Sequence, residues 1–294
     1  MLLVVARGLF VACLISGFGS ALFAMTLLAS ILPSLDTRTG EALKERVRSL
    51  LLASLGGALA ISVAWLVLES ETMSGASTLG ETAAAIPDVF FSTTFGNVLA
   101  LQDLAVAGAL AATAIRRGPS PPVLLAGLAA LLEAGHSHAY AMGHGALLLS
   151  QALHLLAAGA WLGALMPLLI VVRAAPLAAA ALAARRFAMN GTVSVAVLAG
   201  TAFYQGLVLS GGLRGLTGTA YGGVLMIKAA LFALLLALAA LNRWRLTPAL
   251  ARGEGEAARR GLVASITTET VIGLSVVLAA SALSSLEPGM HMPH

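Results

Sequence analysis

The sequence predicts an all-α, polytopic membrane protein whose eight transmembrane helices form one bundle. Of its 294 residues, 59% are hydrophobic and only 10% are charged, whereas soluble proteins carry about 25% charged residues. The lysines and arginines are also concentrated in alternate connections between apolar runs, as is usual for cytoplasmic loops. These two observations exclude a soluble protein. They also account for the net charge of +4 without a nucleic-acid partner.

Eight apolar runs are long enough to cross a bilayer, which takes about 20 residues in a helix. In chain order they are 2–32, 49–69, 93–115, 122–140, 146–172, 187–210, 222–242 and 261–283. The first run has about 30 residues. Because the apolar part of a signal peptide has only about 7–15, we expect this run to be a transmembrane helix. No connection is long enough for a second unit, so residues 1–294 are predicted to form a single transmembrane domain.

The distribution of positive charge predicts how the bundle is oriented. Most Lys and Arg residues follow the first, third, fifth and seventh runs, and few lie in the other connections. Positively charged loops stay in the cytoplasm. Both termini are therefore expected on the outer side of the membrane.

Ionisable side chains inside the apolar runs are candidate functional residues, because a charge in hydrocarbon is costly unless it is paired or hydrated. They are Asp103, Glu133, His154, Lys228 and Glu269. Asp103, Lys228 and Glu269 are possible proton-coupling groups or supports for a metal ligand, and a structural ion pair or polar contact would explain them as well. The outer positions of Asp103 and Lys228 would allow those two to pair. Glu133 could accept a proton, or it could orient His136, which lies three residues later on the same helical face.

All six histidines fall on the outer side or in the outer half of the bundle: His136, His138, His144, His154, His291 and His294. A short turn joins the fourth and fifth runs, so these helices are antiparallel neighbours and His136 can face His154. His138, Met142 and His144 would lie above that pair. Imidazole and thioether groups together favour copper over Mg²⁺ or Ca²⁺, although imidazole also binds zinc or haem iron. The sequence therefore predicts a metal site based on His136 and His154.

Simpler explanations exist for the peripheral residues. An interfacial histidine is often only hydrated, and a methionine often fills a gap in a core. For His138, His144, His291 and His294 taken singly, these explanations are about as good as metal binding. The last two lie in a tail rich in Met and His, which could also be an end without a role.

Several short motifs, in order along the chain, resemble the copper resistance protein D family. They are Gly135-His136, the run 153–165 with His154 and Gly159-Ala160-Trp161-Leu162-Gly163, the run 221–228 ending in Lys228, Asn242-Arg243, and Glu269. The likeness is best over residues 122–286. In the N-terminal half it is mainly one of topology, with Arg7 and Phe18-Gly19 as weaker matches.

The resemblance implies a bacterial inner-membrane protein with eight helices, which handles copper, as Cu⁺ or Cu²⁺, and is thought to move it from periplasm to cytoplasm. In such a membrane the outer termini expected from the charge distribution are periplasmic. It also implies that His136 and His154 form the metal site, while Lys228 and Glu269 match positions of less defined role. Copper-binding proteins of the CopC type are the usual partners. This chain carries no such β-domain, so we expect a separate CopC-like donor or free copper ions.

Two other functions stay open at this point. A b-type haem membrane redox protein would use His136 and His154 as axial ligands, although transmembrane electron transfer usually needs cofactors at two depths. A copper-delivery assembly factor would use the same ligands without transport. No phosphate-binding P-loop motif is present, so ATP cannot drive transport directly. We expect no enzymatic activity.

Overall fold

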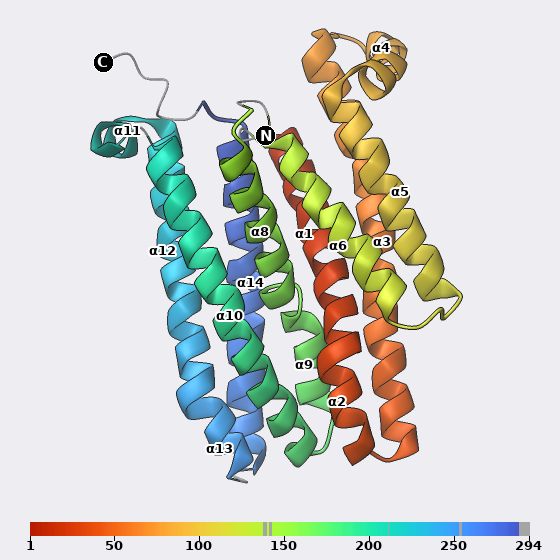
Figure 1. Ribbon diagram of the computed structural model, residues 1–294, viewed down its shortest axis with the longest axis vertical. Helices are drawn as coiled ribbons and strands as arrows, with labels where there is room; N and C mark the ends of the chain where they lie inside the picture. The colour runs from red at the N-terminus through yellow and green to blue at the C-terminus, as the bar shows by residue number, and fades with distance from the viewer. Residues whose placement is uncertain (138–139, 141–142, 211, 253–254, 288–294) are drawn as a thin grey trace.

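The computed structural model describes residues 1–137, 140, 143–210, 212–252 and 255–287, and all their regular secondary structure is helical (Figure 1). The predicted all-α class is therefore confirmed for this part of the chain. The long helices run side by side along one direction, as in a membrane bundle (Figure 1).

Within the described residues, the first half of the chain forms a series of helices of very different lengths. Their bounds are α1 Leu2–Phe23, continued by η1 Ala24–Leu28, α2 Ala29–Ile31 and η2 Leu32–Ser34; α3 Thr37–Ser74; α4 Leu79–Ser92; α5 Thr94–Ala114; and α6 Ser120–Leu132, continued by the 3₁₀ helix η3 Glu133–His136. α6 packs against α1 and α5.

The second half forms the other side of the bundle. Its helices are α8 Gly145–Trp161, α9 Leu165–Ala174, α10 Leu177–Leu209, α11 Gly212–Gly218, α12 Ala220–Leu241, the π-helix η4 Asn242–Leu246, α13 Thr247–Ala251 and α14 Gly255–Ser284. α8 packs against both α10 and α6, and α14 packs against α1, α9 and α12.

Seven helical segments of the described chain are long and apolar enough to cross a membrane. They are Leu2–Ser34, Thr37–Ser74, Thr94–Ala114, Gly145–Ala174, Leu177–Leu209, Ala220–Ala251 and Gly255–Ser284. The expected span at 122–140 is not among them, because α6 ends at Leu132 and the 3₁₀ turn ends at His136. Seven of the eight expected spans are thus found as long helices, and the eighth corresponds to the shorter α6–η3 segment.

Polar side chains begin several helices, and one such helix was not expected. The carboxylate of Asp36 accepts a hydrogen bond from the Thr39 N–H at the start of α3. At α4, the Thr78 hydroxyl accepts from the Glu81 N–H while the Glu81 carboxylate accepts from the Ser77 N–H, an arrangement close to a capping box. The Ser77 N–H bond holds the pKa of Glu81 below its usual value. Local capping therefore stabilises α4, which an apolar run could not predict.

The start of α1 and the end of α14 lie at the same end of the bundle. The Ser281 hydroxyl of α14 donates to the Val4 carbonyl of α1. α4 and α11 also lie at this end, whereas α2 and α13 lie at the opposite end (Figure 1). We call these the terminal end and the basic end, since Arg243, Arg245 and Arg252 lie at or next to α13.

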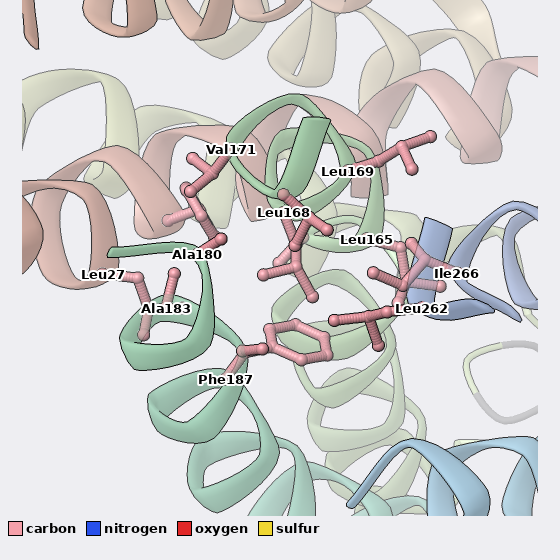
Figure 2. Close-up of a cluster of buried hydrophobic side chains, with 14 of the residues drawn as sticks. Leu27, Leu165, Leu168, Leu169, Val171, Ala180, Ala183, Phe187, Leu262 and Ile266 are labelled. Atoms are coloured by element: carbon pink, nitrogen blue, oxygen red, sulfur yellow. The ribbon is translucent and has the colours of Figure 1, made fainter. Parts of the chain in front are cut away.

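Two buried clusters form the core. One joins α1, α3, α5 and α6 and includes Phe10, Leu55 and Trp65. The other lies towards the basic end, where Leu165 and Leu168 of α9 pack between Phe187 of α10 and Leu262 and Ile266 of α14 (Figure 2). The short helix α9 is thus enclosed by longer helices, and the break between α8 and α9 lies against α1.

Candidate functional site

His136 lies in a hydrogen-bonded cluster at the terminal end. Its Nε2 is 2.8 Å from Oε1 of Gln102 on α5. The amide nitrogen of Gln102 donates to Oε2 of Glu133, at 3.1 Å, and to the Ala129 carbonyl, at 3.2 Å. Because both amide hydrogens are used, Oε1 of Gln102 must accept, and the hydrogen on the imidazole is on Nε2. The neutral ring then keeps its lone pair on Nδ1, the atom that can bind a metal.

Arg7 ties this cluster to the ends of two other helices. Its Nη2 donates to Oε1 of Glu133, at 3.3 Å, and to the His136 carbonyl, at 3.0 Å, while Nη1 donates to the Ser284 hydroxyl of α14. Glu133 is 3% exposed, and Arg7 compensates its charge inside the bundle. Glu133 therefore acts on the His136 ring through Gln102 rather than by direct contact.

Aromatic side chains enclose the same imidazole. The ring of Trp65 on α3 lies edge-on at 4.9 Å from the His136 ring, and that of Phe95 on α5 lies 5.2 Å from it, between centroids. The Arg7 guanidinium lies 5.6 Å from the centre of the Trp65 ring, within range of a cation–π interaction. The indole N–H of Trp65 donates to Glu69. The result is a largely apolar wall around one polar ring.

His154 has an analogous arrangement on the other side of the bundle. Its Nδ1 is 2.8 Å from the hydroxyl of Thr201 on α10, and that hydroxyl itself donates to the Val197 carbonyl at 2.7 Å. Since the single hydroxyl hydrogen is used, His154 donates from Nδ1 and keeps its lone pair on Nε2. The Lys228 ammonium of α12 interacts electrostatically with the His154 ring.

The two histidines are hydrogen-bonded to different helices, and the expectation that they face each other stays a prediction. His136 bonds to α5 and packs on α3, whereas His154 bonds to α10. The reason is local: α6 gives way to the 3₁₀ turn η3, in which Gly135 packs closely on Val98 of α5. Within the described residues, no three His, Cys, Asp or Glu side chains come together as a metal site. Metal binding by His136 and His154 stays a prediction.

The other predicted ligands are placed only in part. His144 is exposed and precedes the first residue of α8. His138, Met142, His291 and His294 lie outside the described residues. The metal-binding predictions for all five remain predictions.

The three remaining intramembrane groups have separate environments. Asp103 accepts a hydrogen bond from the Ser62 hydroxyl at 3.0 Å. It forms no ion pair with Lys228 among the residues that the structure describes. The helices that carry the two groups, α5 and α12, lie on opposite sides of the bundle (Figure 1). Glu269 accepts from the Asn242 amide and lines a cavity towards the basic end.

Sequence reasoning missed Gln102, Trp65 and Thr201. Gln102 is fully buried, and a glutamine within an apolar run could have been noticed for the same reason as its neighbour Asp103. Trp65 and Thr201 are ordinary residues of membrane helices. Only their contacts with the two histidines distinguish them.

Comparisons with known proteins agree with the motifs. A family model described as copper resistance protein D-like, N-terminal domain, matches residues 1–150, and one described as copper resistance protein D matches residues 181–283. The chain is similar to copper resistance protein D of Pseudomonas syringae pv. tomato, with 30% identity over 93% of this chain and 92% of that protein. It is also similar to inner membrane protein YebZ of Escherichia coli (strain K12), with 31% identity over 47% of this chain and 48% of that protein. No solved structure matches.

Proposed function

Since the chain belongs to the copper resistance protein D family, we propose that it is a multi-pass inner-membrane protein that binds copper at its terminal end and moves it across the membrane. In this proposal α6 and η3 complete an eighth span, the terminal end is periplasmic and the basic end is cytoplasmic. A CopC-like protein or free ions supply the copper. The protein acts as a carrier without enzymatic activity.

The observation that carries the proposal is the hydrogen bond between His136 and Gln102. A histidine that binds a metal usually donates its other ring N–H to a protein acceptor, which fixes the tautomer and the ring orientation. His136 has this arrangement. The Gln102 amide in turn donates a hydrogen bond to the Glu133 carboxylate, and Arg7 donates another to the same carboxylate. Glu133 is therefore assigned a positioning role in place of proton transfer.

We also propose a path for copper through the predicted ligands. One imidazole does not complete a copper site, so His138, Met142 and His144 are proposed to supply further ligands beside His136. The tail residues His291 and His294 are proposed to capture copper before it reaches them. Because His136 and His154 are hydrogen-bonded to different helices, His154 is proposed as a second, separate station. Its Nε2 lone pair is kept open by the bond to Thr201.

Copper binding to the purified full-length protein tests the proposal. His136→Ala should remove most of the affinity, because it deletes the positioned ligand. His154→Ala should leave copper binding at the terminal end but reduce copper uptake into proteoliposomes. Asn97→Ala, an exposed position on α5, serves as the control and should change neither. Unchanged affinity in His136→Ala contradicts the site, and a Soret band that disappears in that variant would identify haem instead. Binding without uptake would favour a delivery factor.

Gln102 offers a test of the hydrogen-bond network itself. Gln102→Leu should weaken copper binding about 10- to 100-fold, the usual effect of removing the partner of a metal-binding histidine. Gln205→Leu removes an amide whose bond goes to Ser150 instead, and it should leave the affinity unchanged. Chelator competition with copper measures both. Equal affinities in the two variants would show that Gln102 has no positioning role.

A further inference from the structure

Glu269 is a buried carboxyl group near the middle of α14. It is 1% exposed, and the Asn242 side-chain amide is its hydrogen-bond donor. Among the described residues, no Lys, Arg or His forms an ion pair with it. This differs from Glu133, which has both an arginine and an amide. A carboxylate with so little compensation is costly inside a membrane.

Asn242 lies in the π-helical turn η4 that follows α12, and this turn brings its amide to α14. Its Oδ1 is buried and has no hydrogen-bond partner in the described part of the chain. A buried carbonyl oxygen of this kind is usually bonded to a water molecule. Asn242 Oδ1 is therefore an oxygen atom for which water is the natural partner, and it belongs to the same side chain that bonds Glu269.

A cavity of about 170 Å³ gives space for that water. Glu269 and Asn242 both line it, and its apolar wall includes Leu168, Phe187 and Ile266 of the cluster in Figure 2. Since a water molecule takes up roughly 30 Å³ in the liquid, the cavity holds several. Polar groups on one side and room for several molecules are the conditions under which buried water is stable.

The cavity adjoins an open cleft of about 450 Å³ at the basic end. Both are lined by Ala188, Arg243, Trp244 and Thr247. The cleft also exposes Arg185 and Arg252, and η4 and α13 lie at the end of the bundle opposite the start of α1 (Figure 1). The shared lining residues place the cavity beside the cleft, which is the arrangement that a water connection from Glu269 to the basic end requires.

Arg243 is the other charged side chain that lines the cavity. Its guanidinium donates to the Ala188 carbonyl and the Thr192 hydroxyl of α10, which holds it at the boundary between cavity and cleft. Charged groups elsewhere on the neighbouring helices, such as Lys228 of α12 and Arg173 of α9, do not line the cavity. A positive charge at the entrance disfavours a metal ion, and the oxygen donors inside are a poor match for copper.

We propose that Glu269 is a proton-binding site that exchanges with the solution at the basic end through water in this cavity. A hydronium ion in the cavity gives its proton to Oε2 of Glu269 and remains as water, while Oε1 keeps its hydrogen bond from Asn242. The reverse transfer releases the proton to the cleft. The site stands independently of copper transport. If the proposed function holds, it supplies the cytoplasmic half of a proton coupling.

Infrared difference spectroscopy of the full-length protein tests this site directly. We expect a carbonyl band of a protonated carboxyl group that responds to pH and to exchange into D₂O. The band should be lost in Glu269→Gln and retained in Glu41→Gln, which changes an exposed carboxylate paired with Lys44. A band that persists in Glu269→Gln, or one that does not respond to pH, overturns the proposal.

Two further measurements separate this site from the copper site. Glu269→Gln should bind copper with unchanged affinity, and loss of copper binding would make Glu269 a metal ligand and overturn the proposal.

In a Cys13→Ser background, Ala188→Cys should react with a small water-soluble thiol reagent added at the basic end. Val193→Cys, which is exposed on the outer surface of α10, should not react. An unreactive Ala188→Cys would show that the water path is absent. If the unmodified protein did not bind copper, the proposed function would be contradicted. The evidence for a proton-binding site at Glu269 would be unaffected.

Discussion

Gly163→Ala should greatly reduce the amount of folded protein. Gly163 lies in the break between α8 and α9, where a Cβ atom would be 1.9 Å from the Ile15 carbonyl oxygen of α1 and 2.6 Å from that of Gly159. The contact is reciprocal, since a Cβ on Gly19 would lie 2.3 Å from the Gly159 oxygen. Ordinary overpacking of a core costs about 1–3 kcal/mol. We expect a larger cost here, because the obstructing atoms are backbone and cannot rotate away.

Gly200→Ala is the matched control for this substitution. Gly200 lies inside α10, and a Cβ there would meet nothing within 4 Å. Alanine should be tolerated or slightly stabilising at that position, by up to about 1 kcal/mol, because it favours a helix more than glycine does. The yield of monodisperse protein and the thermal midpoint in detergent measure both variants. Equal midpoints for Gly163→Ala and Gly200→Ala would mean that α1 and the α8–α9 break do not pack this closely.

Arg7→Met should destabilise the terminal end by about 3–5 kcal/mol, the usual cost of leaving one member of a buried ion pair without its partner. Glu133 would keep only the Gln102 bond, and the links from α1 to η3 and to Ser284 of α14 would be lost. The free energy of unfolding in detergent micelles measures the change. Copper affinity should fall as well, since the chain of contacts that orients His136 begins at Arg7.

A double substitution distinguishes the ion pair from packing. In Arg7→Met with Glu133→Gln, no buried charge is left unpaired, so much of the lost stability should return. Arg116→Met provides the control: Arg116 pairs with Glu45 at 3.0 Å, with side chains 66% and 49% exposed. A pair that is exposed to this degree contributes only about 0–1 kcal/mol. If Arg7→Met were no worse than Arg116→Met, the buried network would have no structural role.

The structure explains why glycines stand at two positions of the motif that resembles the family. Gly159 and Gly163 were recognised by resemblance, and the structure gives the reason for them, which is the close approach of α1. Small residues four apart are typical of helix contacts in membranes. These positions therefore serve packing, whereas His136 and Gln102 are candidates for chemistry.

Hydropathy by itself determined the helical class and the positions of the long helices, because backbone groups in hydrocarbon must be bonded within the segment. The spacing of three residues also placed Glu133 and His136 on one helical face. Both contact Gln102, as a shared face requires. Helix ends were less predictable. α3 extends to 37–74 instead of 49–69, since its polar ends continue as helix outside the apolar run.

Only the tertiary structure decided which neighbour each face meets. A helical period tells which residues lie together, but it does not tell which helix packs against them. The 3₁₀ turn η3 packs against both α5 and α8, and the hydrogen bond of the His136 ring goes to Gln102 of α5. For the same reason Lys228 and Asp103 do not pair, since α12 and α5 lie on opposite sides of the bundle (Figure 1). The cavity beside Glu269 depends on the π-turn η4 and on side chains from several helices. Such a space arises from packing between distant segments, which no local pattern in the sequence records.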